Sequence, residues 1–449
     1  MSSCRRRPDW VLLNIHAVAG FHSNGTTARD STRNGKTIEV SLCPALPPHP
    51  SNLFVHSSDM NVCVPPVIVC TVDDLLLLRV NMGCGPFSLS PVDCDYFIYR
   101  AHASRPSLER LQRPHPFFQN SDVGLLPRPD GHYTVAALIA IGPVHQYVLH
   151  LFHSKISSWS CSTLSVKAPQ REFPVKIPSH SGRLHHHLTT TVITIGGEGG
   201  TMGWVDLWRG ILFCDVLDNK PSLRGVSLPL PLKEMSYNNG MGMKLGAAGQ
   251  RRGIAFIRDK GCLKFVHLEI SDVRLPGYDD ETGAPSFRTD DWAVTTWTNT
   301  KMTDSFEDWH QDYMVQASDI TIDNPAISEV LESGLLRKPR GNGAAAEELA
   351  LQNLSMYQPA PCVNGKDVVY LVAREKFMHP KAWILAVDME NSELQAVVEF
   401  GAQIHLGATV IYCPSSISKY TNPAKYINPS TTPVEKGPAG LNDQDSAAE

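Results

Sequence analysis

The feature that most constrains this chain is a succession of short apolar, β-branched segments separated by turn residues. Gly, Pro, Asn and Asp alternate with segments such as residues 133–141, 146–152 and 159–166, which is typical of strands joined by tight turns. Similar segments form three more groups of three or four between residues 187 and 400. The groups recur at about 40–50 residues, the spacing of propeller blades. Helical periodicity is clearest over residues 327–336.

The sequence therefore predicts a mostly β chain, with a β-propeller-like body of repeated three- to four-stranded antiparallel sheets and few short helices. The chain has 449 residues, 42% of them hydrophobic, a composition that excludes disorder throughout. A pair of β-sandwich domains is the alternative that this length allows. We expect a β-rich body over residues 8–420, less regular over 8–125 and regular over 126–420. A disordered tail is expected over 421–449, which is poor in aliphatic residues.

The net charge and the cysteine content indicate which kinds of partner and which cellular compartment to expect. A net charge of −5 argues against a generic nucleic-acid binder, which usually has a basic surplus. The 11 cysteines contain no C-x-x-C pair, so free thiols in a reducing compartment are expected. The N-terminal apolar stretch is interrupted by polar residues, and no apolar window reaches about 18 residues. We expect neither a signal peptide nor a membrane segment, and a location in the cytoplasm, the nucleus or both.

Motifs that carry chemistry are scarce. Residues 185–187 are consecutive histidines, but neighbouring strand residues point to opposite faces, so a solvated loop is preferred to a metal site. The glycine-rich residues 196–200 are followed by another strand-like segment and not by a helix, which favours a hairpin turn over a phosphate loop. No G-x-S-x-G or H-E-x-x-H motif occurs. No catalytic residue, cofactor or metal is therefore expected.

Residues 200–215 place Trp204, Asp206, Trp208 and Arg209 around a corner between two apolar segments. One interpretation is a polar pair for binding, with an indole as a stacking surface. The other, which we favour, is a structural corner held by a charge-assisted hydrogen bond beneath aromatic cover. It predicts that Trp204 and Trp208 are mostly buried.

A second aromatic region is acidic and spans residues 279–291 and 304–311. It is interpreted either as solvated loops or as a surface that recognises a basic peptide. Because function concentrates in loops carried by a rigid scaffold, we take four residues as candidate partner-binding positions: Asp291, Trp292, Trp297 and Trp309. The partner is expected to be a protein, while its identity and the oligomeric state stay open.

Several ordered segments carry a resemblance to a known family. The longest are residues 203–215 (GWVDLWRGILFCD) and 223–231 (LRGVSLPLP), with shorter ones at 10–13 (WVLL), 95–101 (DYFIYRA) and 133–138 (YTVAAL). In these the chain resembles the plant domain of unknown function 1618, a family expanded in grasses. The resemblance implies a plant intracellular protein with a β-propeller-like body, and it carries over no catalytic residue. We therefore expect a non-enzymatic protein-interaction module. The alternative is a hydrolase-like enzyme with its site in a central pocket.

Overall fold

The protein is described by a computed structural model. It describes residues 8–83, 91–112, 118–141, 146–168, 187–229, 247–303, 305–336, 350–400 and 412–422. Within these ranges the chain forms strands β1–β26 and a few short helical turns. None of the helices in them is both long enough and apolar enough to cross a membrane.

The described residues form five antiparallel meanders, each built from four strands that follow one another in the chain. Three of them are separate sheets, and the second and third are joined into one eight-stranded sheet by parallel pairing of their last strands. The first contains β6 (Val67–Val72), β7 (Leu75–Asn81), β8 (Cys94–Arg100) and β9 (Ser107–Arg110). The second contains β10 (Val123–Pro127), β11 (Tyr133–Ile141), β12 (Gln146–His153) and β13 (Ser158–Ala168). The third contains β14 (Thr191–Gly196), β15 (Thr201–Asp206), β16 (Gly210–Asp215) and β17 (Leu223–Ser227). The fourth contains β18 (Arg252–Ile257), β19 (Cys262–Tyr278), β20 (Pro285–Asn299) and β21 (Trp309–Gln316). The fifth contains β22 (Ser355–Pro361), β23 (Val368–Arg374), β24 (Ala382–Asp388) and β25 (Glu393–Phe400).

The remaining sheet joins the two ends of the described chain. Its order is β26 (Tyr412–Ser415), β1 (Val11–Asn14), β5 (Pro50–Ser57), β4 (Thr37–Cys43) and β3 (Ala28–Ser31), with β2 (Val18–Ala19) also paired to β5. Strand β26 runs antiparallel to β1. A strand from near residue 412 thus completes a sheet that begins at residue 11, which ties the body closed and leaves fewer free sheet edges.

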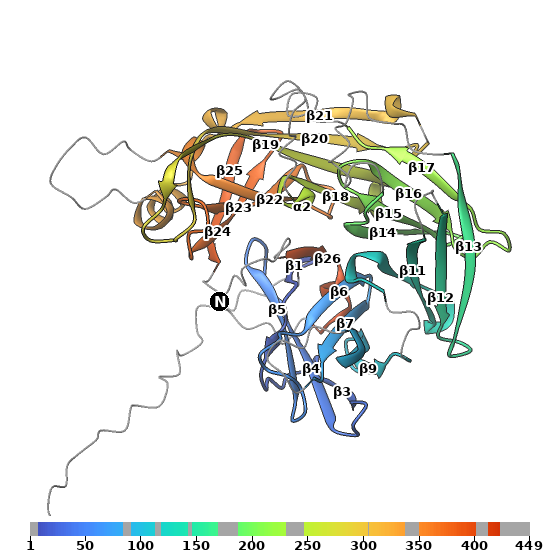
Figure 1. The fold of residues 1–449 in the computed structure, drawn as a ribbon. Helices are drawn as coiled ribbons and strands as arrows, with labels where there is room; N and C mark the ends of the chain where they lie inside the picture. The colour runs from blue at the N-terminus through green and yellow to red at the C-terminus, as the bar shows by residue number, and fades with distance from the viewer. Residues whose placement is uncertain are drawn as a thin grey trace, which may run out of the picture.

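The N-terminal sheet and the five meanders follow one another around a common centre in chain order, from blue through green and yellow to red (Figure 1). Their first strands β6, β10, β14, β18 and β22 contact each other in sequence. Strand β26 closes the ring: Ser415 Oγ lies 2.9 Å from Thr71 Oγ1 of β6, and the Tyr412 hydroxyl donates to the Gln358 carbonyl of β22 over 3.0 Å. The mostly β, propeller-like fold predicted from the sequence is confirmed.

Strand β7 shows why the apolar segments are so continuous. Leu75, Leu76, Leu77 and Leu78 are all fully buried. Leu76 and Leu78 pack into the core shared with the N-terminal sheet, whereas Leu75 and Leu77 pack into the core shared with the β10–β13 sheet. Successive side chains of a strand point to opposite faces, so a sheet between two neighbours needs apolar residues on both.

In the part of the chain that the structure describes, helical structure is confined to short pieces. The α-helices there are α2 (Ala248–Arg251) and α3 (Pro325–Val330), and a π-helical turn follows at Leu331–Leu335. The helical prediction for residues 327–336 is confirmed, and the Asn324 side chain caps its start by accepting from the Ala326 N–H over 3.0 Å. Single 3₁₀ turns lie at Pro91–Asp93, Asn120–Asp122, Pro129–Gly131, Arg258–Lys260, Phe306–Asp308, Ala317–Asp319, Leu351–Asn353 and Ile417–Tyr420.

The segment 279–291, predicted as a charged loop, is corrected by the structure. Strand β19 runs on to Tyr278 and β20 begins at Pro285, so only residues 279–284 connect them. The two strands form a long hairpin whose outer part, residues 271–291, we call the arm. The β19 part of the arm is exposed along its whole length. The sequence therefore has no alternation of apolar and polar residues there that would predict a strand. The tail predicted over 421–449 lies outside the described residues from residue 423 onward.

Candidate functional site

The conspicuous sequence motif of residues 200–215 forms the β15–β16 hairpin, and its two indoles lie in the interior. Trp204 is 0% exposed and Trp208 is 3% exposed, so the prediction that both are mostly buried is confirmed. The Trp204 indole N–H donates to the Asp122 carbonyl over 2.7 Å, which links this hairpin to the 3₁₀ turn before β10. Neither indole is available as a stacking surface for a ligand.

Asp206 holds the corner between β15 and β16. Its carboxylate accepts the backbone N–H groups of Trp208 and Arg209 at 2.9 and 3.3 Å, and that of Leu188 at 2.9 Å. Burial raises the pKa of Asp206, while these N–H groups and the Arg209 charge act in the opposite direction. The polar pair thus sits in a buried turn, where its hydrogen bonds fix the backbone.

A residue that the sequence did not single out, Arg252, completes this corner from the next sheet. It is 1% exposed and lies over the Trp208 ring at 4.8 Å from the centroid. Its Nη1 and Nη2 donate to the Leu207 and Pro229 carbonyls, both over 2.8 Å, and its Nε donates to His267 Nδ1 over 3.2 Å. Burial, together with the Arg252 charge, holds the pKa of His267 well below its usual range, so this imidazole is neutral. No periodicity could have identified this link, because it joins backbone carbonyls of one sheet to a side chain of another.

His187 also belongs to this interior. Burial lowers its pKa to about 3, and the nearby Arg209 charge adds to the effect. The prediction of a solvated histidine is therefore wrong for His187, whereas residues 185 and 186 lie outside the described residues. The described ranges hold no group of three or more His, Cys, Asp or Glu side chains that could bind a metal ion.

The four candidate partner-binding residues lie in and beside the arm's sheet, and two of them are core residues. Trp292 is buried and donates its indole N–H to the Leu351 carbonyl over 2.8 Å. Trp309 is buried and donates to the Ser227 carbonyl over 2.8 Å. Trp297 is half-buried, with its ring 5.6 Å from that of Phe265. These indoles pack between sheets, so a partner would have to bind exposed residues near them.

Asp291 is half-buried at the base of the arm, and its carboxylate accepts the backbone N–H of Trp292 over 2.8 Å. Beyond it the arm presents three exposed apolar side chains. Val273 is 44% exposed, Leu275 36% and Tyr278 68%. Exposed apolar side chains grouped on one projecting element are typical of an interaction surface.

The tip of the arm is fixed to the β22–β25 sheet. Lys376 Nζ lies 2.8 Å from both Asp279 Oδ2 and Glu281 Oε2, and the Phe287 and Phe377 rings meet edge to face at 5.1 Å. The hydrogen bond from Lys376 lowers the pKa of Asp279 to about 2. The acidic residues of the predicted loop therefore hold the arm in place through a lysine of the neighbouring sheet.

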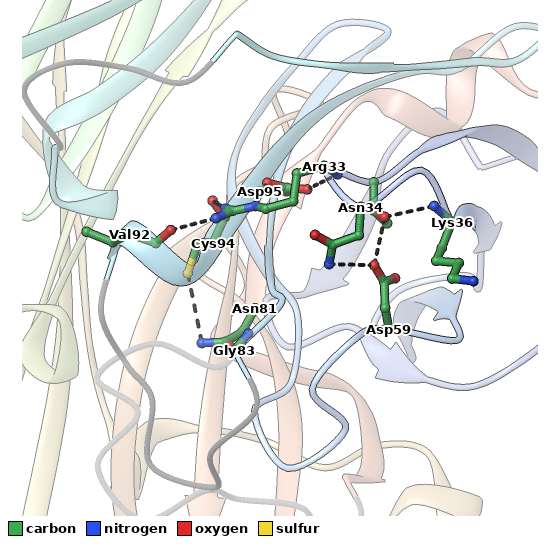
Figure 2. A network of polar contacts seen from close by, with 10 residues as sticks. Arg33, Asn34, Lys36, Asp59, Asn81, Gly83, Val92, Cys94 and Asp95 are labelled. Atoms are coloured by element: carbon green, nitrogen blue, oxygen red, sulfur yellow. Dashed lines mark hydrogen bonds and ion pairs between the residues drawn. The ribbon is translucent and has the colours of Figure 1, made fainter.

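A groove of about 460 Å³ lies beside strands β8 and β9. Its lining residues are Arg33, Cys94, Asp95, Tyr96, Glu109, Arg110, Leu111, Gln112, Phe152 and Ser157. Figure 2 shows that polar contacts hold the Arg33 side chain in the wall of this groove. Its Nε lies 2.5 Å from Asp95 Oδ1, and its Nη1 donates to the Val92 carbonyl over 2.7 Å. Its backbone N–H donates to Asp95 Oδ2 over 2.8 Å.

A smaller cavity of about 140 Å³ shares Glu109 with this groove and includes His132 and Tyr133. Burial, reinforced by the Glu109 charge, raises the pKa of Tyr133 far above its usual range, so this phenol stays protonated. Both cavities are lined by turns and by the second, third and fourth strands of their meanders. They do not supply the central pocket that the enzyme alternative expects.

Comparison with known proteins gives a family match and distant structural likenesses. An α-L-arabinanase from Penicillium chrysogenum shares 9% identity and a TM-score of 0.28, over 88% of this chain and 99% of that chain. An uncharacterized protein from Listeria monocytogenes shares 10% identity and a TM-score of 0.27, over 75% and 82%. A polysaccharide lyase shares 7% identity and a TM-score of 0.29, over 89% and 90%. No curated protein sequence is significantly similar. Over residues 204–370 the chain matches the family model described as a protein of unknown function, DUF1618.

Proposed function

We propose that this chain is a plant intracellular protein-interaction module of the grass-expanded kind, and that the arm is its partner-binding surface. The observation that carries the proposal is the exposure of β19: all eight residues from 271 to 278 are exposed, and Val273, Leu275 and Tyr278 are apolar. Exposing apolar side chains to water is unfavourable by about 25 cal/mol per Å². A protein partner that covers these side chains would remove that cost.

Two further features support the arm as a binding element. Its tip is fixed by Lys376, so little ordering entropy is lost when a partner binds. It also lies within residues 204–370, which match the family model. The partner is a protein segment that offers apolar side chains to this strand.

The proposal is tested by proximity labelling in grass cells with the full-length chain. The arm variant carries Val273→Ser, Leu275→Ser and Tyr278→Ser. The matched control carries Leu46→Ser, Val62→Ser and Ile156→Ser, three exposed apolar side chains outside the arm. Partners recovered with the wild type should be lost with the arm variant and kept with the control, while melting temperatures stay alike.

An identical list from the wild type and the arm variant would refute the arm as the binding surface. If no protein is recovered above background with any chain, the interaction function itself fails. A hydrolase-like activity then becomes the leading explanation.

A further inference from the structure

The arm has strand edges that no other strand of the described chain occupies. Strand β18 pairs with β19 only as far as His267, and β21 pairs with β20 only as far as Ala293. Residues 268–278 therefore continue as part of a two-stranded ribbon, paired to β20 alone. An exposed strand edge is a template for pairing with another chain.

The sequence of this edge is complementary to itself when two copies run antiparallel. Residues 271–275 read Ser-Asp-Val-Arg-Leu. If Val273 faces Val273 of a second copy, Asp272 of each copy faces Arg274 of the other, and Ser271 faces Leu275. Opposite charges across a strand pair are stabilising, whereas like charges are destabilising.

Neighbouring registers lack this match. A pairing centred on Asp272 sets two carboxylates against each other, and one centred on Arg274 sets two guanidinium groups against each other. Residue 276 is proline, which has no backbone N–H, so the pairing ends near residue 275. Asp272 is accessible, with a side chain 42% exposed, and the distance between its Oδ2 and Arg251 Nη2 is long at 3.7 Å.

We propose that the arm pairs with the arm of a second copy of this chain, forming a two-fold dimer through antiparallel pairing of residues 271–275. The pair places Val273 and Leu275 of both copies on one face of a four-stranded ribbon. Because one short strand pair is a small interface, we expect weak self-association that depends on protein concentration. This inference concerns self-association and does not require the partner of the proposed function.

The test is sedimentation velocity of the purified full-length chain from about 1 to about 200 µM. The wild type should shift from monomer to dimer across this range. Arg274→Asp makes both positions acidic and should weaken self-association at least tenfold, as should Asp272→Arg, which makes both positions basic. An equimolar mixture of the two variants should associate again, because each copy then offers the charge that the other lacks.

Melting temperatures like that of the wild type show that the variants fold. A wild type that stays monomeric at every concentration would overturn the dimer, and so would an Arg274→Asp variant that dimerises as well as the wild type. Failure to recover association in the mixture would overturn the proposed register. Arm-dependent labelling of another protein by a monomeric chain would support the proposed function while rejecting the dimer.

Discussion

Replacing Trp208 with alanine probes whether the family motif is structural. The indole is 3% exposed and carries the Arg252 guanidinium over its face at 4.8 Å. Removing a buried tryptophan costs about 3–5 kcal/mol through lost transfer free energy and the cavity left behind. A buried cation–π contact accounts for about 2 kcal/mol, so the loss should fall in the upper part of that range.

The assay is denaturant unfolding of Trp208→Ala beside the wild type, with the midpoint and slope both fitted. The matched control is Trp159→Ala, because Trp159 is half-buried and its indole N–H donates to the Gln112 carbonyl over a longer 3.3 Å. The control should lose about 1–2 kcal/mol. A loss below about 1 kcal/mol for Trp208→Ala, or an equal loss for both variants, would refute a structural role for the motif.

Three further predictions follow from the packing. Burial raises the pKa of Asp122 from 3.8 to about 6, so the folded state binds more protons than the unfolded state between these values. Stability should fall as pH rises through that window, and Asp122→Asn should remove the fall; parallel melting curves for both proteins would contradict this. Gly253→Ala places a Cβ 1.9 Å from the Pro359 carbonyl oxygen, whereas at Gly261 a Cβ meets nothing within 4 Å but the φ is +60°. Gly261→Ala should cost about 1 kcal/mol and Gly253→Ala clearly more in thermal melts, and the reverse order would count against this close approach. Arg252→Lys keeps the charge but loses the planar fork, so it should cost about 2–4 kcal/mol in denaturant unfolding; an unchanged midpoint would contradict it.

The sequence could predict the individual strands well, because each is an apolar run ended by turn residues. Strand β11 matches its predicted residues 133–141, and β12 and β13 extend their predictions by only one or two residues at an end. The closing strand β26 could not be paired in advance, since its partner β1 lies about 400 residues away in the chain and nothing local encodes that register.

The candidate site was harder to predict, because tryptophan and acidic residues serve both interfaces and cores. The sequence predicts Trp292 and Trp309 as partner-binding positions, yet their indole N–H groups donate to backbone carbonyls between sheets. The arm was not predicted as a strand because its β19 part is exposed, whereas the tryptophans are buried. A strand that is exposed on both faces needs no alternation of apolar and polar residues, so Val273 and Leu275 look like part of an irregular charged region.

Hydrogen–deuterium exchange of the full-length chain, alone and with the protein most enriched by wild-type labelling, tests the binding surface most directly. The account predicts slower exchange in peptides that span residues 271–291, where the free chain exposes its strand. Peptides from β7, which is buried between two sheets, should exchange alike in both samples. Protection confined to another surface, such as the groove beside β8 and β9, with no change in the arm, would contradict the account.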